Sequence, residues 1–242
     1  MREKFTHCVS RITHHASRLN AMRNTILWAV LGCMMFLCPN VLGQERDEII
    51  DLVQQQYEVT DDMQAAFTQL SFIKSLGQTK ESHGVVYFKK PGKMRWEYTD
   101  PDQQLLVSDG NTMWFYVADD AQVLIQDARD AYGSKTPITF LSGMGKLQND
   151  FYINLLPPDA EKAGLVDGHR LELLPKQPQP DVAKLVLTVD PDSFQVVHTA
   201  VYDPYGNITD VYLQDMQINV ELPDELFLFE IPEGVDVIRQ DQ

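Results

Sequence analysis

The chain has 242 residues, a formal net charge of -15 at pH 7 and a hydrophobic fraction of 44%. This length suits one domain preceded by a targeting segment. An acidic field of this strength repels phosphate backbones, which proteins bind through clustered Lys and Arg, so the composition excludes nucleic acid as a partner.

The first 43 residues differ in character from the rest. Five basic residues precede an apolar run from Ile26 to Cys38, and Pro39-Asn40 and Val41-Leu42-Gly43 follow it. This is the layout of a secretory signal peptide. As a helix the run would rise only ~20 Å, less than the ~30 Å of a bilayer core, which argues against a permanent anchor. We therefore expect a signal peptide over residues 1–43, with Met22 as an alternative start, and a single domain over residues 44–242.

All three cysteines, Cys8, Cys33 and Cys38, lie in this leader. The exported part would carry 15 basic and 34 acidic residues, a formal charge of about -19. Because it has no cysteine, its stability in an oxidising compartment must come from a buried core. A lipid anchor is the competing interpretation, since Val30-Leu31-Gly32-Cys33 loosely resembles a lipobox. A lipidated Cys33 would, however, be followed by the apolar stretch 34–37, where a polar tether is expected.

After the leader, the pattern predicts one helix and then strands almost to the end. The helix is predicted over Glu45–Tyr57, where Ile49, Ile50 and Val53 recur at helical spacing. Beyond it the period changes to two, with turn signals such as Pro91-Gly92 between the alternating segments. The predicted strands are Ala65–Lys74, Val85–Lys90, Met94–Thr99, Gln104–Ser108, Thr112–Val117, Gln122–Gln126, Phe151–Leu155, Arg170–Leu174, Ala183–Asp190, Gln195–Tyr202, Ile208–Ile218 and Leu226–Glu230.

A second helix is predicted over Thr136–Met144, with Thr136 as its N-cap and Pro137 at the first helical position. The short spacers between strands favour antiparallel neighbours. An antiparallel sheet of about a dozen strands curls, and its concave face must be filled by side chains, a helix or a ligand. The predicted fold is therefore mostly β with a few helices: a large curled antiparallel sheet forming a half-open barrel with a helical lid.

No catalytic or metal-binding motif stands out. His83, His169 and His198 lack metal-ligand spacing, and neither a Gly-x-Ser-x-Gly elbow nor a phosphate-binding Gly-rich loop occurs. The paired acids Asp61-Asp62 and Asp119-Asp120 adjoin predicted turns or strand ends, so we interpret them as solvated. We predict no catalytic residue, no metal site and no cofactor. An envelope hydrolase acting on acyl or glycan substrates stays as an alternative, because a fold can bring separated acids together.

Six ordered blocks of sequence carry a resemblance to a known family. The most specific is GVVYFKKPGKMRWEY over residues 84–98. The others are PDQQLLVSDG over 101–110, MWFY over 113–116 with Gln122-Val123, Thr136-Pro137 with Leu141, Asp203 with Gly206, and FLF over 227–229 with PEGVDVI over 232–238. Together they resemble the outer-membrane lipoprotein carrier family, the LolA-type proteins.

This resemblance implies an exported, monomeric half-barrel whose concave face is covered by a helical lid. Family members take triacylated lipoproteins from an inner-membrane ABC transporter and pass them to an outer-membrane receptor lipoprotein, without a cofactor. We therefore expect a periplasmic carrier, not an enzyme, that binds lipoprotein acyl chains in an apolar cavity. The alternative is a receptor lipoprotein or a lipid-binding envelope-stress sensor of the same fold. A receptor would need a lipidated N-terminal cysteine, and the known sensors carry an additional domain.

The cavity and its lid are expected to be built from apolar side chains of these blocks. Met94 and Trp96 alternate with Arg95 and Glu97, so they share one face of a strand. The alternative for each candidate is an ordinary core residue. The expected lining residues are Phe67, Phe88, Met94, Trp96, Trp114, Ile138, Leu141 and Met144.

The resemblance also suggests a lid latch, meaning a cation that hydrogen-bonds the lid. Well-studied members have an arginine just before the conserved proline, whereas this chain has Lys90 there and Arg95 nearby. A lysine offers a point charge instead of a planar fork of donors. Lys90 and Arg95 are therefore the latch candidates, and a solvated surface lysine is the alternative for Lys90.

Overall fold

A computed structural model describes residues 41–128, 147–158 and 167–240. It divides into two compact units, Met1–Asp47 and Glu48–Gln242, and the second contains all the strands. The helix predicted over Thr136–Met144 lies outside the described residues. Within the described ranges, no helix is both long and apolar enough to cross a membrane. The same ranges contain no group of three or more His, Cys, Asp or Glu side chains placed to hold a metal ion.

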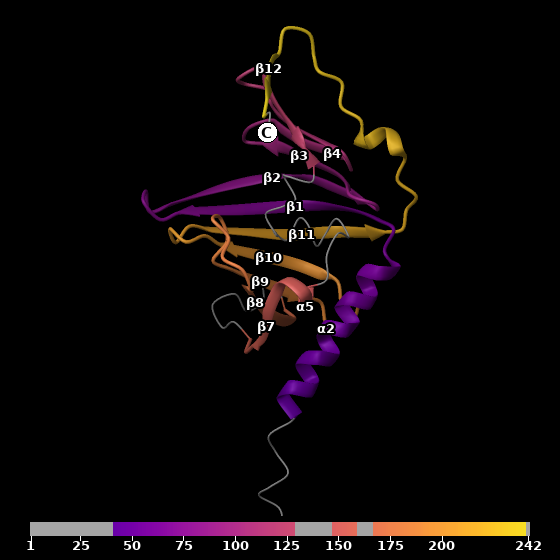
Figure 1. The fold of residues 1–242 in the computed structure, drawn as a ribbon, viewed down its shortest axis with the longest axis vertical. Helices are drawn as coiled ribbons and strands as arrows, with labels where there is room; N and C mark the ends of the chain where they lie inside the picture. The colour runs from indigo at the N-terminus through magenta and orange to yellow at the C-terminus, as the bar shows by residue number, and fades with distance from the viewer. Residues whose placement is uncertain (1–40, 129–146, 159–166, 241–242) are drawn as a thin grey trace, which may run out of the picture. The chain divides into compact units, whose positions relative to one another are not determined.

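One curled, unclosed sheet of 12 strands makes up most of the second unit (Figure 1). The order across it is β12-β6-β5-β4-β3-β2-β1-β11-β10-β9-β8-β7. Its pairs are antiparallel except β12 with β6, as short connections require. The strands are β1 (Asp62–Ile73), β2 (Gln78–Lys89), β3 (Lys93–Asp100), β4 (Gln104–Asp109), β5 (Thr112–Val117), β6 (Gln122–Asp127), β7 (Phe151–Leu156), β8 (His169–Pro175), β9 (Lys184–Val189), β10 (Val196–Tyr202), β11 (Ile208–Ile218) and β12 (Asp236–Arg239).

The predicted antiparallel sheet and all predicted strands except the last are confirmed. The strand predicted over Leu226–Glu230 is wrong. A 3₁₀ helix η1 (Asp224–Phe227) stands there instead, and the final strand is β12. The segment from Leu226 to Phe229 is apolar at every position, so it has no alternation that could identify one buried face. Pro223 and Pro232 on either side lack the N–H that a ladder needs.

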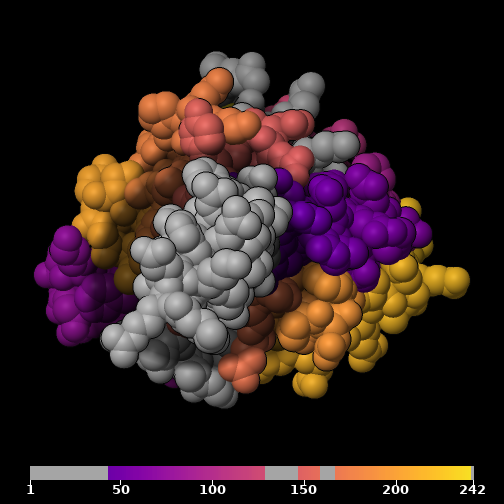
Figure 2. All heavy atoms as spheres, turned by 90° about the horizontal axis from the view of Figure 1, so that it is seen from below, coloured from indigo at the N-terminus to yellow at the C-terminus, as the bar shows by residue number. Residues whose placement is uncertain are grey.

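Helix α2 (Val41–Val59) contains the helix predicted over Glu45–Tyr57. Its Ile49, Ile50 and Val53 are buried against the sheet, as their spacing predicts. We call the side of the sheet that they cover the inner face. In Figure 2 the indigo residues of α2 border orange residues of the later strands. Besides the three helix residues, this first apolar cluster contains Leu147, Phe151, Ile153, Leu171, Leu173, Val182, Leu185, Leu187, Val189 and Val196.

A second apolar cluster lies on the same face, above β1, β2 and β3. Strand register shows that the two clusters share a face, because Leu171 pairs with Leu187, then Thr199, Val211 and finally Gln69 across five strands. The apolar side of the whole curled sheet is therefore continuous. The second cluster contains Met63, Ala65, Phe67, Val86, Phe88, Met94, Trp96, Met113, Ala128, Val211 and Leu213.

Gly84 makes room for the aromatic rings of this second cluster. It lies at a register shift between β2 and β3, directly opposite Phe67 of β1. A Cβ at Gly84 would lie 2.7 Å from Cε1 of Phe67 and 1.9 Å from the carbonyl oxygen of Glu97. No larger residue fits there unless the ring and the neighbouring strand move.

The chain end covers part of the other side of the sheet, which we call the outer face. We define the C-terminal strap as residues 219–240. Phe227 of the strap is fully buried, and the Phe229 ring lies 6.3 Å from the Trp114 ring and 5.8 Å from the Tyr116 ring. The strap then ends in β12, which pairs with β6. The strap therefore shields the part of the outer face around Trp114, while a pocket opens beside Leu105 and Tyr116.

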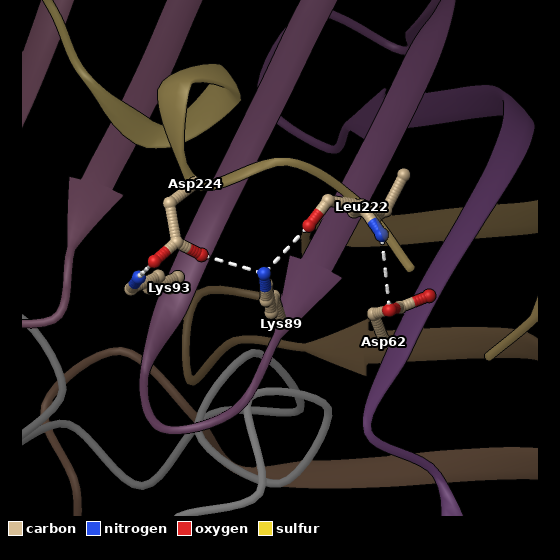
Figure 3. A network of polar contacts seen from close by, with 5 residues as sticks. All are labelled: Asp62, Lys89, Lys93, Leu222 and Asp224. Carbon is tan, nitrogen blue, oxygen red and sulfur yellow. Dashed lines mark hydrogen bonds and ion pairs between the residues drawn. The ribbon is translucent and has the colours of Figure 1, made fainter. Parts of the chain in front are cut away.

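Polar contacts anchor the start of the strap (Figure 3). The carboxylate of Asp62 accepts hydrogen bonds from the backbone N–H of Val220 at 2.8 Å and of Leu222 at 3.1 Å. Asp62 is only 4% exposed, so its interpretation as a solvated acid was wrong. Asp224 lies between Lys89 and Lys93, whose amino groups are 2.5 and 2.9 Å from its oxygens. Hydrogen bonds from Lys89 and then Lys93 lower the pKa of Asp224 to about 2.

Substitution of Gly84 by Ala is expected to destabilise the fold by about 1–3 kcal/mol, the usual cost of overpacking a core. The midpoint of urea denaturation measures this change. Thr79→Val, at an exposed position of the same strand, serves as the matched control and should leave the midpoint nearly unchanged. Equal midpoints for Gly84→Ala and the wild type would show that the rings do not need this space.

The ion pairs of Asp224 with Lys89 and Lys93, which we call the Asp224 clasp, are expected to weaken in acid. The pKa of Asp224 in the folded state lies below the ordinary value of 3.8, so its stabilising effect is complete above about pH 4 and disappears as the pH falls toward 2. The unfolding midpoint of Asp224→Asn should therefore be lower than that of the wild type at pH 6, and the two should converge near pH 2. Glu225→Gln is the control at the neighbouring exposed position. A gap between wild type and Asp224→Asn that is independent of pH would contradict the ionic origin of the clasp.

Candidate functional site

The second apolar cluster arranges its side chains in rows across three strands. Met63 of β1 pairs with Phe88 of β2, which pairs with Met94 of β3. One step along the strands, Val86 pairs with Trp96. The Trp96 ring lies 4.9 Å from Phe67 and 6.0 Å from Phe88, so these aromatic rings form one continuous apolar wall.

Four of the predicted lining residues meet in this wall: Phe67, Phe88, Met94 and Trp96, each buried. Trp114 does not join them. Arg95 pairs with Val107, and Val107 pairs with Trp114, so Trp114 lies on the outer face, where it contacts Phe229 of the strap. Its neighbour Met113 takes the inner position instead. The remaining predicted lining residues, Ile138, Leu141 and Met144, lie outside the described residues.

A pocket opens between the C-terminal end of α2 and the apolar wall. It is narrow, with a cavity volume of about 30 Å³. Met63, Phe88 and Ile218 form its apolar side, and the rest of the inner face is occupied by packed side chains of the two clusters. The full set of lining residues is Gln56, Tyr57, Thr60, Asp61, Asp62, Met63, Phe88, Lys89, Lys90, Gln195, Val196, Met216 and Ile218.

The rim of the pocket holds the last turn of α2. A helix leaves its final carbonyl groups without partners inside the helix, and α2 has no basic residue in its last turn. Lys90 donates to the carbonyl of Tyr57 and, at 3.3 Å, to that of Glu58. Asn219 donates to the carbonyl of Val59 at 3.0 Å, and the Thr60 hydroxyl donates to that of Gln56 at 2.8 Å.

The two latch candidates, Lys90 and Arg95, make contacts on different faces of the sheet. Lys90 is not a solvated lysine, since it fastens α2 beside the pocket. Arg95 lies on the outer face, where it donates to Glu97 at 3.1 Å and to the carbonyl of Leu226 at 3.4 Å. Sequence reasoning missed Asn219, which also accepts a hydrogen bond from the N–H of Asp61 at 2.7 Å. A lone asparagine at the end of a predicted strand gives no signal of such a contact.

A polar strip borders the apolar wall on the inner face. The Tyr98 hydroxyl donates to Oε1 of Gln69 at 2.9 Å, and Nε2 of Gln69 donates to the Ser71 hydroxyl at 3.1 Å. Burial raises the pKa of Tyr98 to about 12, against the opposing effect of the polar groups of Trp96 and Gln69. Tyr98 therefore stays a neutral hydroxyl at physiological pH.

Thr188, His198 and Asp210 form a connected group on the outer face that resembles a catalytic triad only in composition. The ring nitrogens of His198 lie 3.1 Å from the Thr188 hydroxyl and 2.8 Å from Oδ1 of Asp210. Thr188 and His198 are each 3% exposed, and the Tyr212 ring stacks on the imidazole at 4.4 Å. A hydroxyl this deeply buried cannot reach a substrate, so we assign the group to cross-strand stabilisation.

Comparison with known proteins gives a consistent result. The profile of a family described as "Outer membrane lipoprotein carrier protein LolA" matches residues 58–230. A protein of Methylococcus capsulatus named "Outer-membrane lipoprotein carrier protein" is 34% identical over 178 residues, 73% of this chain and 81% of that protein. One of the same name from Alkalilimnicola ehrlichii is 30% identical over 90% of this chain and 97% of that protein.

A solved structure is also similar. It is a LolA superfamily protein from Nitrosomonas europaea, with a TM-score of 0.42 and 14% identity, and the match covers 76% of this chain and 97% of that one.

Replacement of Lys90 by Met is expected to loosen the last turn of α2. The loss of charge-assisted hydrogen bonds to helix carbonyls should cost about 1–2 kcal/mol of unfolding free energy. Amide exchange of residues 56–60 should accelerate in the same variant. Lys80→Met is the control, because Lys80 pairs with Asp102 at the surface, away from the helix. Unchanged exchange in Lys90→Met would show that α2 is held by its apolar contacts alone.

Proposed function

Because the chain belongs to the outer membrane lipoprotein carrier protein family, we propose that it carries triacylated lipoproteins through the periplasm with their acyl chains held against the inner face. In this proposal residues 1–43 direct export and are then removed. The carrier works as a monomer without a cofactor. It receives its cargo from an inner-membrane ABC transporter and gives it to an outer-membrane receptor lipoprotein.

The observation that carries the proposal is the difference between the two faces of one sheet. The inner face presents a continuous apolar wall beside an open pocket. Part of the outer face of the same strands is covered by the C-terminal strap, with Phe227 fully buried. Among the described residues the outer face also has a pocket, beside Leu105 and Tyr116, but polar side chains such as Gln103 and Gln104 form much of its lining. The inner face offers the more apolar surface next to an opening, which is what a carrier of lipid needs.

Energetics explain why lipoproteins need such a surface. Each buried methylene contributes about 0.8 kcal/mol, so an acyl chain of lipid length prefers a bilayer to water by a wide margin. A carrier must offer comparable apolar contact and also release the chains. Packed clusters that separate on loading meet both demands, because their own contacts replace those of the cargo when the cargo leaves.

Several features at the pocket suit an opening motion. Met63, Met94 and Met113 stand in the apolar wall, and unbranched methionine side chains adapt to differently shaped partners. Lys90 and Asn219 fix the C-terminal end of α2, so the helix keeps its attachment while the space beside it changes. We propose that Ile138, Leu141 and Met144 complete the apolar lining as a lid.

Adjacent residues on opposite faces allow a direct test of this function. A photoreactive phenylalanine analogue is placed at Phe88 on the inner face or at Tyr87 on the outer face. Each variant is produced in cells depleted of the natural protein. Irradiation should cross-link acylated lipoproteins at position 88 and not at position 87, because only position 88 faces the cargo.

The same cells provide the functional readout and the control. Depletion alone should cause lipoproteins to accumulate at the inner membrane, and the Tyr87 variant should restore their sorting. A cargo whose acylated cysteine is replaced by serine should give no cross-link at position 88. Normal lipoprotein sorting after depletion, in cells without a second carrier, would overturn the proposal.

A further inference from the structure

Trp96 has a polar group that the fold leaves unpaired. Its side chain lies inside the apolar wall and the residue is only 6% exposed. Among the described residues, no acceptor meets the indole Nε1–H in good hydrogen-bond geometry. The Tyr98 hydroxyl, whose pKa this N–H helps to lower, lies nearby but outside that geometry. An indole nitrogen is a donor only, and buried tryptophans usually give this donor a partner. A phenylalanine would supply the same apolar ring without the cost of an unpaired donor.

The position of Trp96 is a boundary in polarity. On one side the row of Met63, Phe88 and Met94 contains no polar side chain. On the other side lies the polar strip in which Tyr98 donates to Gln69. The indole N–H therefore stands where an apolar surface gives way to hydrogen-bonding groups.

Acylated molecules have the same boundary in their own structure. Their hydrocarbon tails end at a carbonyl group, and the polar linkage begins there. A carbonyl oxygen is a neutral acceptor without a donor, which matches a lone N–H in an apolar wall. A charged acceptor would pay a far larger desolvation cost at this depth.

The pocket gives a route to this donor. Its apolar side is formed by Phe88, whose ring meets the Trp96 ring edge-on at 6.0 Å. Trp96 itself does not line the pocket, so acyl tails would reach the indole only after the Phe88 ring moves aside. Tails that follow the apolar row would then place their carbonyl end at Trp96.

On the basis of the carrier function proposed above, we propose that the Trp96 indole N–H is a binding group for an acyl carbonyl oxygen of the cargo lipid. Trp96 thereby sets the depth to which the tails enter and distinguishes acyl chains from plain hydrocarbon. The carbonyl belongs either to a glyceryl ester or to the N-terminal amide of a triacylated cysteine.

The test uses the purified exported chain, residues 44–242, labelled with ¹⁵N in its two tryptophans, Trp96 and Trp114. A tripalmitoylated cysteine lipopeptide is added, and the indole signals are followed by NMR after assignment with Trp96→Phe. The Trp96 signal should move to the position of a hydrogen-bonded indole. The Trp114 signal should stay, because that ring lies on the outer face. An analogue with ether-linked chains in place of the esters tells the ester source from the amide source.

Binding measurements complete the test. Trp96→Phe should bind the lipopeptide roughly three- to tenfold more weakly, the effect of one hydrogen bond, while Trp114→Phe binds like the wild type. Two results would overturn this inference and leave the carrier function standing. One is unchanged affinity in Trp96→Phe, and the other is a Trp96 signal that does not shift when the lipopeptide or its ether-linked analogue binds. Failure of the wild type to bind any acylated ligand would overturn both.

Discussion

The pairing of β1 with β11 is the interaction on which this fold depends. Strands β1 to β6 form one meander and β7 to β11 form another, and each is built from neighbours in sequence. Among the described strands, only β1 and β11 join the two meanders, through a register that runs from Met63 with Ile218 to Phe72 with Ile208. Without this pairing there would be two small sheets, each with its own apolar side. With it, the two apolar clusters share one face.

The same junction connects the helix, the pocket and the C-terminal strap. Asp62 opens β1 and holds the backbone of the strap, while Asn219 at the end of β11 binds the last carbonyl of α2. Lys90, just past β2, binds the two carbonyls before it. Elements far apart in the chain therefore meet within one hydrogen-bonded joint beside the pocket. The joint fixes one end of α2 while the apolar contacts along the wall remain non-directional.

Much of the sheet could be predicted because its strands alternate in polarity. In β3, Met94 and Trp96 are buried, while Arg95 and Glu97 between them are only partly buried, as their alternation predicts. Alternation in polarity does not identify the buried side of a strand when both faces of that strand are covered by other parts of the protein. In β5 the run from Met113 to Tyr116 is apolar throughout, since one side faces the cluster and the other faces the strap. The side on which Trp114 lies could therefore not be predicted from this pattern.

The joint escaped prediction for a different reason. In the sequence, Asp62 resembles a turn acid and Asn219 a loop residue. Their structural role comes from partners more than 150 residues away in the chain, which a local pattern does not reveal. Burial of a carboxylate with two backbone donors is a property of the assembled fold. The β12 strand was missed because it is short and its four residues are all exposed, so nothing in it alternates.

The position of β1 in the middle of the sheet has a consequence for how the protein acquires its structure. The first meander is complete once Asp127 has been made, yet the far edge of β1 must wait for Ile208–Ile218. During that interval a long strand with an apolar side stands open, and such edges attract other chains. While the chain is being synthesised or exported from its N-terminus, β1 can therefore aggregate with other chains until β11 arrives to pair with it. A chain that stops before β11 would keep the unpaired edge of β1, and we expect it to aggregate instead of retaining partial function.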